Sequence, residues 1–272
     1  CTADFSCTNV TRAGPWLWDP VKADSAKVGG TTGSGYDPLT VGGNMWFNRA
    51  TALTGTQGPT YQLGAAANRV EMISGVATDV VYLTSDSQGS GFPGLFRYVL
   101  GDVRSGGTDS ITKIGFTTTS TIGQGVATLD TTHNLFIRTT DYLGASAGAD
   151  RPDLAVWMLS KMGTPGSNLD IPVRLVLSDG SDFTITRNYG MDFDPTSGLV
   201  VLYEDTNLGQ VWYAQPAFDG NGTPLTTWTV TPVSSANGAA PAGTWSTGVL
   251  GKWHFMSDLG AFVAVGAYKI IS

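Results

Sequence analysis

The segment from Tyr189 to Val233 contains four short apolar stretches separated by turn residues, and it constrains the fold more than any other part of the chain. The first stretch ends in the turn Asp194-Pro195-Thr196-Ser197-Gly198, where proline and glycine favour turn dihedral angles. The second, Leu199-Val200-Val201-Leu202-Tyr203, predicts a strand that is buried on both faces. Four strands in about 45 residues is the size of one β-propeller blade.

Four other segments repeat this order of glycine, apolar strand, turn aspartate and second apolar strand. They begin at Gly35, Gly75, Gly125 and Gly248, and their turn aspartates are Asp37, Asp79, Asp130 and Asp258. Third strands are expected at Gly94–Val99 and Leu154–Leu159, and fourth strands at Ile111–Phe116 and Arg174–Leu177. The repeats predict an all-β propeller of five blades, or of six if residues 141–177 contain a further small sheet.

The two ends of the chain complement each other. The last repeat has two or three strands and lacks an outer edge, while Pro15-Trp16-Leu17-Trp18 resembles the strand Val211–Ala214. We therefore expect N-terminal strands to complete the last blade, which would close the ring and hide open sheet edges. Residues 1–272 would then form a single domain.

Composition supports an all-β protein and argues against two classes of partner. Of the 272 residues 36 are glycine and 14% are charged, a balance that favours turns and strands over surface helices. The net charge is −7 without clustered lysine or arginine, which disfavours nucleic acid because phosphate contacts need clustered cations. No apolar run reaches about 18 residues, so no transmembrane segment is expected.

Cys1 and Cys7 are the only cysteines of the chain. The leading interpretation is a small disulfide loop, which implies an oxidising compartment and an extracellular or cell-surface location. One alternative makes Cys1 the acylated first residue of a bacterial lipoprotein, and another leaves two reduced thiols. A zinc site is not expected, because too few ligands lie nearby.

The segment from Gly248 to Val265 resembles the closing blade of secreted kelch-like, galactose-oxidase-type propellers. The turns Tyr36-Asp37-Pro38 and Phe193-Asp194-Pro195 are similar to turns in that group. The resemblance implies a secreted propeller, but it provides no counterpart of the copper ligands, so we expect no cofactor and transfer no catalytic residue. Ser178–Thr184 is close to the Asp-box of sialidase-like propellers, which is a structural turn and indicates the fold only.

Asp192 and Glu71 are candidate catalytic carboxylates. Five-bladed propellers are similar to a class of glycoside hydrolases that place acids on inner strands, and this chemistry needs two carboxyl groups a few ångström apart. The alternative is that Asp192 hydrogen-bonds a turn or another blade and that Glu71 is a solvated strand residue. His254 could act as a general base at the channel, or could be a packed or hydrogen-bonded strand histidine.

Trp245 and Trp253 are candidate sugar-binding residues, since an aromatic face packs against the apolar face of a pyranose. Trp245 follows the loop 234–243, and Trp253 lies next to His254. Asp219-Gly220-Asn221-Gly222-Thr223 slightly resembles a calcium loop but lacks the later acidic ligand, which favours a β-turn. Two histidines are too few for a typical metal centre, so no metal site is expected.

These observations together predict a secreted or surface-displayed propeller that binds a glycan. The mechanism would be several weak contacts from equivalent loops held on one rigid body. One alternative is a polysaccharide-active hydrolase or lyase that uses the central channel. Another is a structural or adhesive component of a cell surface, phage particle or extracellular assembly, which would bind a surface protein. The sequence leaves open whether the chain is an enzyme.

Overall fold

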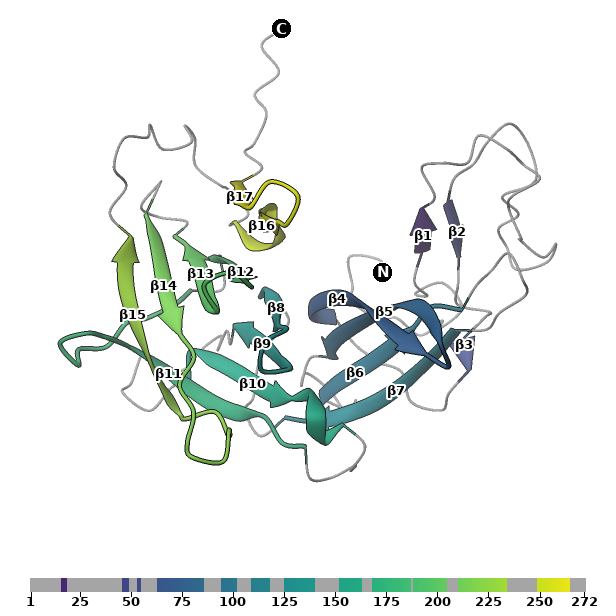
Figure 1. Cartoon of the computed structure of the whole chain (residues 1–272), viewed down its shortest axis with the longest axis horizontal. Helices are drawn as coiled ribbons and strands as arrows, with labels where there is room; N and C mark the ends of the chain where they lie inside the picture. The colour runs from purple at the N-terminus through teal and green to yellow at the C-terminus, as the bar shows by residue number, and fades with distance from the viewer. Residues whose placement is uncertain are drawn as a thin grey trace, which may run out of the picture.

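The structure is a computed structural model, and it describes residues 16–18, 46–48, 53–54, 63–85, 94–101, 109–117, 125–139, 152–162, 168–186, 188–204, 210–233 and 249–264. Within these ranges the protein is all-β (Figure 1), as the composition predicts, and the helical segments are the short 3-10 turns η5 (Leu159–Lys161) and η6 (Leu250–Lys252). No helix in these ranges has the length and apolar character needed to cross a membrane. The strands are β1 (Trp16–Trp18), β2 (Trp46–Asn48), β3 (Leu53–Thr54), β4 (Leu63–Ile73), β5 (Val76–Ser85), β6 (Gly94–Val99), β7 (Asp109–Phe116), β8 (Ala127–Asp130), β9 (Leu135–Thr139), β10 (Leu154–Met158), β11 (Ile171–Leu177), β12 (Gly190–Asp194), β13 (Leu199–Tyr203), β14 (Val211–Gln215), β15 (Thr227–Val233), β16 (Trp253–Met256) and β17 (Ala261–Ala264).

The strands from β4 to β15 form three consecutive four-stranded antiparallel meanders, namely β4–β7, β8–β11 and β12–β15. The second and third meanders join into one eight-stranded sheet, because β11 pairs with β15 in parallel. The end strands of this sheet, β8 and β12, contact each other, so the sheet curls nearly into a barrel. The third meander is the four-stranded unit that the segment from Tyr189 to Val233 predicts.

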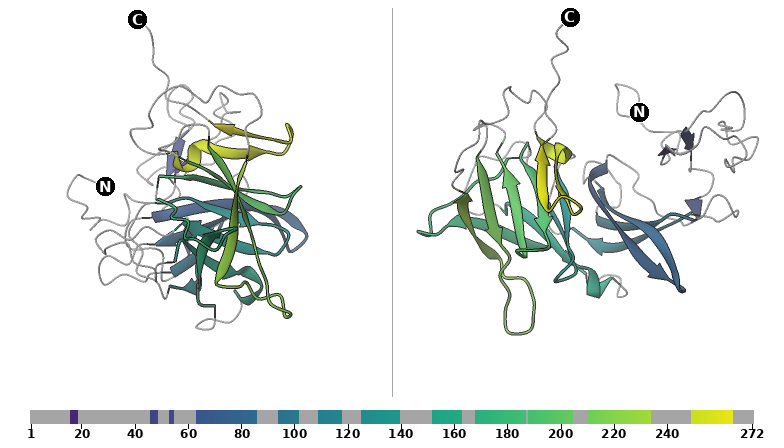
Figure 2. Two further views of the ribbon diagram at one scale, coloured as in Figure 1. Left: turned by 90° about the vertical axis from the view of Figure 1, so that its left-hand side faces the viewer. Right: turned by 45° about the horizontal axis from the view of Figure 1, so that its top comes forward.

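The first strands of successive units lie against one another. β4 contacts β8, β8 contacts β12, and β12 contacts β16, the first strand of the β16–β17 hairpin. Figure 2 shows this yellow hairpin beside the green strands of the third meander. The side chains of these first strands can therefore interact from one unit to the next.

The core lies between the units, because strands in the middle of each meander are apolar on both faces. In β13, Val200 and Leu202 pack into the cluster inside the barrel-like sheet, while Val201 and Tyr203 pack against the β16–β17 hairpin. Successive side chains of a strand point to opposite faces, so this alternation buries both faces. The burial confirms the prediction made for residues 199–203.

Turn aspartates lie at the junction of the first and second strands at three of the predicted positions, which are Asp130, Asp194 and, in the turn between β16 and β17, Asp258. The Oδ1 atom of Asp130 accepts hydrogen bonds from the amides of Thr132 and His133, both at 2.9 Å. Asp194 accepts from the Thr196 amide at 2.9 Å in the same way. Short polar side chains stabilise turns by hydrogen-bonding the backbone two residues on. The predictions for Asp130, Asp194 and Asp258 are confirmed.

The prediction for Asp79 is wrong. Asp79 lies inside β5, and the turn that opens this strand is Ser74-Gly75, whose φ angles are 51° and 81°. Two-residue hairpin loops of type I′ need positive φ at both central residues, which glycine adopts without strain. Asp79 precedes an apolar run, as the turn aspartates of the other repeats do, but it lies within the strand and forms no turn. Asp37 lies outside the described residues.

The N-terminal strand does not complete the last unit. β1 pairs with β2, with Trp16 opposite Asn48 and Trp18 opposite Trp46, while β16 and β17 form a separate two-stranded sheet. Likeness to β14 does not determine which strand the short β1 pairs with, because register and partner depend on the tertiary packing. The described residues thus show three meanders and a hairpin, and the five-bladed ring is not seen in them.

Candidate functional site

Asp192, the middle residue of β12, joins three strands that are not paired with one another in a sheet. Its Oδ1 atom accepts hydrogen bonds from the Thr128 hydroxyl on β8 at 2.6 Å and from the Phe193 amide at 2.8 Å. Its Oδ2 atom accepts from the Phe255 amide on β16 at 2.8 Å and lies 2.5 Å from Nδ1 of His254. These contacts confirm the alternative in which Asp192 hydrogen-bonds between repeats.

His254 is exposed, although its partner is not. The side chain of His254 is 67% exposed and that of Asp192 is 13% exposed. A carboxylate only accepts hydrogen bonds when ionised, so the proton of a neutral His254 lies on Nδ1 and Nε2 remains an acceptor. The structure therefore brings two of the three candidate catalytic residues together as an oriented, solvent-accessible imidazole. Such a group can accept a proton from a bound ligand.

His133 makes a second pair of the same kind in the turn after β8. Its Nδ1 atom lies 2.7 Å from Oδ2 of Asp130, whose side chain is fully buried. Its ring contacts the ring of Phe218 in a tilted arrangement, with centroids 4.2 Å apart. The chain has two histidines, and both are thus paired with a carboxylate through Nδ1.

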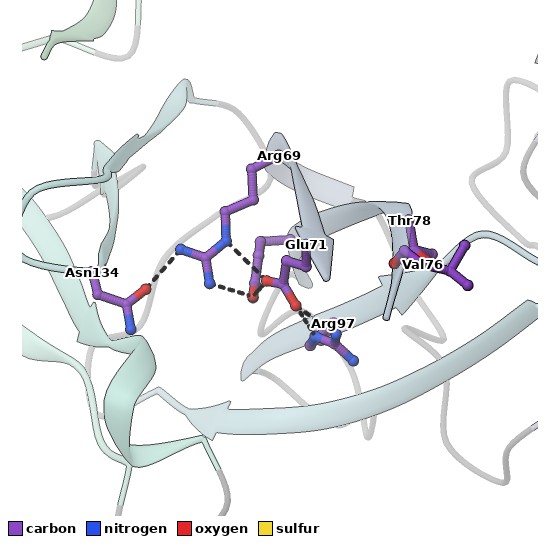
Figure 3. A network of polar contacts seen from close by, with 7 residues as sticks. Arg69, Glu71, Val76, Thr78, Arg97 and Asn134 are labelled. Atoms are coloured by element: carbon purple, nitrogen blue, oxygen red, sulfur yellow. Dashed lines mark hydrogen bonds and ion pairs between the residues drawn. The ribbon is translucent and has the colours of Figure 1, made fainter. Parts of the chain in front are cut away.

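Glu71 is the centre of a separate network on the face of the first meander that packs toward β8 and β9 (Figure 3). Arg69 Nε donates to its Oε1 atom at 2.8 Å, Arg97 Nη2 donates to its Oε2 atom at 2.6 Å, and the Tyr82 hydroxyl also donates to Oε1. Arg69 Nη1 continues the network to Oδ1 of Asn134 at 2.7 Å. Glu71 lies within β4 and is 14% exposed, so its interpretation as a solvated strand residue is wrong.

The charges of this network stabilise one another. Burial alone would raise the pKa of the Glu71 carboxyl, but hydrogen bonds from Tyr82, Arg97 and Arg69 outweigh burial and hold the pKa below its ordinary value. Burial would lower the pKa of Arg97, and Glu71 reverses that effect. Burial and Glu71 together raise the pKa of Tyr82. Glu71 and Arg97 therefore remain charged, and Tyr82 remains a neutral donor.

Glu71 and Asp192 belong to two different hydrogen-bonded networks among the described residues. A general acid in glycoside hydrolysis needs a raised pKa, whereas the pKa of Glu71 is lowered. The two carboxylates therefore act as acceptors that hold neighbouring groups in place.

Trp253 is a packing residue in the structure. It is 8% exposed, stacks on Phe262 with ring centroids 4.9 Å apart, and contacts the ring of Tyr203 at 4.8 Å. Its indole N–H donates to the carbonyl of Val201 at 3.3 Å. Both ring faces and the polar atom are thus in contact with protein, and the expectation that Trp253 stacks on a sugar is wrong. His254, the next residue on β16, points to the opposite, solvent-exposed face because side chains alternate along a strand.

Three of the predicted residues lie outside the described residues. They are Trp245, Cys1 and Cys7. The sugar-binding role of Trp245 and the disulfide between the cysteines stay predictions.

The loop from Asp219 to Thr223 is a turn. The Oδ1 atom of Asp219 accepts hydrogen bonds from the amides of Asn221 and Thr223, both at 2.8 Å. An oxygen that its own loop uses in this way is a turn acceptor, which confirms the β-turn interpretation. In the described ranges, no group of three or more His, Cys, Asp or Glu side chains is placed to hold a metal ion.

Sequence reasoning missed the partners of the candidate residues. Arg69, Arg97 and Asn134 come from β4, β6 and the turn after β8, and only the strand register places them together. The spacing of Arg69 and Glu71 was a usable signal, because residues two apart on a strand share a face. Thr128 carried no such signal, since its contact with Asp192 depends on how β8 meets β12.

No family model matches this chain, and no curated protein or solved structure matches it either. The function therefore has to be inferred from the residues themselves.

Proposed function

We propose that this protein is a five-bladed β-propeller that binds a glycan outside the cell or at its surface. The proposed scaffold is supported by the three antiparallel meanders, whose first strands lie side by side as inner strands of a propeller do. The resemblance of residues 248–265 to kelch-like propellers is compatible with this scaffold and stays a prediction.

The observation that carries the proposed function is the gathering of planar polar side chains around the contacts between first strands. Arg69 and Glu71 on β4 reach Asn134 beside β9, while Asp192 on β12 reaches His254 on β16. Each group is partly exposed and held by neighbours, as polar groups that orient a ligand usually are. Guanidinium, carboxamide and imidazole groups offer the donors and acceptors that sugar hydroxyls need.

Binding without hydrolysis agrees better with the state of the carboxylates than a hydrolase does. Glu71 has a lowered pKa, and Asp192 already accepts four contacts, so neither is a proton donor poised for a glycosidic oxygen. One observation favours a second candidate, a polysaccharide lyase. The exposed imidazole of His254, oriented by Asp192, has the geometry of a base that removes a carbon-bound proton.

Binding of the purified chain to a broad glycan array, with a search for soluble products from the same sugars, tests the proposal. We expect binding and no products, and Asn134→Ala should weaken that binding while Asp79→Ala, on the opposite face of the hairpin, should not. Unsaturated products that disappear in His254→Gln would support the lyase instead. Neither binding nor products would leave the structural or adhesive component, which predicts capture of a surface protein without sugar.

The proposed location has a test of its own in the cysteines. A disulfide between Cys1 and Cys7 would make the mass of the intact protein rise by two hydrogens on reduction, and that result is expected. Acylated Cys1 would instead add the mass of a lipid, and two free thiols would count against an oxidising compartment.

A further inference from the structure

We propose that the guanidinium pair of Arg69 and Arg97 binds the acidic group of an anionic glycan, a carboxylate or a sulfate ester. This inference rests on the proposed function and specifies the class of glycan. The pair lies on the face of the first meander that packs toward β8 and β9, around Glu71 (Figure 3).

Counted over the described residues, the network has one more positive than negative charge. Arg69 and Arg97 each contribute one positive charge, Glu71 contributes one negative charge, and Tyr82 and Asn134 are neutral. The lowered pKa of Glu71 and the raised pKa of Arg97 keep these charges in place near neutral pH. A partly buried site with excess positive charge favours an anionic ligand, because the neighbouring protein screens the charge less than water does.

The two arginines have different parts in the proposed site. Arg69 uses Nε for Glu71, Nη1 for Asn134 and Nη2 for the Tyr82 hydroxyl, so its side chain is fixed. The bonds from Arg97 to Glu71 use Nε and Nη2 and leave Nη1 unused, and Arg97 also interacts with the Tyr82 hydroxyl. The side chains of Arg69 and Arg97 are equally exposed, at 22% each, so their hydrogen bonds and not their exposure distinguish them. Arg97 is therefore the residue that can offer N–H groups of Nη1 to a ligand oxygen, while Arg69 contributes its positive charge.

The chemistry of the guanidinium explains why the ligand is an oxyanion. Guanidinium presents N–H groups in a planar fork that fits the two oxygens of a carboxylate or a sulfate, and such charge-assisted hydrogen bonds are stronger than bonds to a hydroxyl. Asp79, an acid of the same hairpin, is paired with Val70 and so points to the opposite face from Glu71. It does not oppose an anion at the arginine pair.

Calorimetric titration of the whole chain with matched oligosaccharides tests the inference. The probes are short galacturonate oligomers with their methyl esters, and sulfated dextran oligomers with unsulfated dextran. Short oligomers limit repulsion from the net charge of −7. We expect one charged probe to bind about tenfold or more tightly than its neutral partner. The pair that shows this preference tells whether the acidic group is a carboxylate or a sulfate.

Three variants assign the preference to the site. Arg97→Gln should reduce it to near equality, and Arg97→Lys should keep part of it, because the charge remains and the fork is lost. Glu71→Gln removes the competing carboxylate and should strengthen binding of the acid several-fold. Arg174→Gln is the matched control, since Arg174 pairs with Asp182 beside β11 in a different sheet, and it should change nothing.

The outcomes separate this inference from the proposed function. Binding of neutral and acidic glycans with equal affinity would overturn the inference and leave a glycan-binding protein. An acid preference that survives in Arg97→Gln would also overturn it. If no glycan binds at all, the proposed function fails together with the inference. Thermal unfolding of each variant shows whether it is folded. If Arg97→Gln is not folded, Glu71→Gln tests the inference: tighter binding of the acidic glycan supports it, and unchanged or weaker binding overturns it.

Discussion

Replacing Asp192 with alanine should destabilise the protein strongly, because one carboxylate holds β8, β12 and β16 together. The substitution removes the acceptor of the Thr128 hydroxyl at 2.6 Å and of the Phe255 amide at 2.8 Å. It also removes the partner of His254, but that side chain is exposed and water can replace the contact. The cost therefore comes from the donors that water reaches poorly.

The size of the effect follows from the number of donors left without an acceptor. The Phe193 amide keeps a bond to Oγ1 of Thr128 at 3.0 Å, so its loss is partly compensated. The Thr128 hydroxyl and the Phe255 amide lose their acceptor, and each unsatisfied buried donor costs about 1–3 kcal/mol. Two such donors sum to about 2–6 kcal/mol. Because both bonds are only partly buried, we expect the free energy of unfolding to fall by about 2–4 kcal/mol, a large part of the roughly 5–15 kcal/mol typical of a folded protein.

Urea unfolding followed by tryptophan fluorescence measures this change, and Asp79→Ala is the control. Asp79 is an exposed strand aspartate, so its replacement should stay within about 0.5 kcal/mol of the wild type. Hydrogen exchange adds a local measurement, since the Phe255 amide should lose protection in Asp192→Ala. A loss of stability below about 0.5 kcal/mol in Asp192→Ala would refute the view that this carboxylate joins the three strands.

Three further predictions concern burial and packing. Burial raises the pKa of Asp153 to about 6 from its ordinary 3.8, so the folded state binds the proton more tightly than the unfolded state and loses stability as pH rises from about 4 to about 6. Asp153→Asn should remove about 3 kcal/mol of this loss, measured by comparing unfolding curves below pH 4 and above pH 6. Gly190→Ala should cost about 1–3 kcal/mol, since a Cβ atom there would lie 2.5 Å from Cβ of Trp253, and a midpoint of urea unfolding equal to wild type would contradict this packing. Trp253→Ala should cost about 3–5 kcal/mol, and in conditions where it remains folded it should still bind glycan, which a binding titration can check.

Much of the strand order was predictable because it depends on local pattern. The stretch at residues 199–203 is apolar at successive positions and is buried on both faces, and the turns at Asp130 and Asp194 follow from short carboxylates that bond to their own backbone. The same rule failed at Asp79. Gly75 has the positive φ that the hairpin turn requires, and Asp79 lies within the strand and takes no part in the turn.

The candidate site was predictable only as a set of residues. Asp192 and His254 were both selected from the sequence, but their contact depends on β12 meeting β16 and has no local sequence signal. Trp253 was selected for its aromatic ring, but that ring is buried against Val201 and Tyr203 of the third meander. The network around Glu71 needed the register of β4, β5 and β6 before Arg97 could be recognised as its partner.

The sequence by itself determined the all-β class, the four-stranded unit and its turns, because a two-residue side-chain period and turn residues act within a few positions of one another. The tertiary structure alone decided that Asp192 joins three strands, that His254 is oriented, and that two arginines share Glu71. The physical reason is that a polar side chain takes its charge and hydrogen-bond partners from whichever neighbours packing brings within about 3 Å.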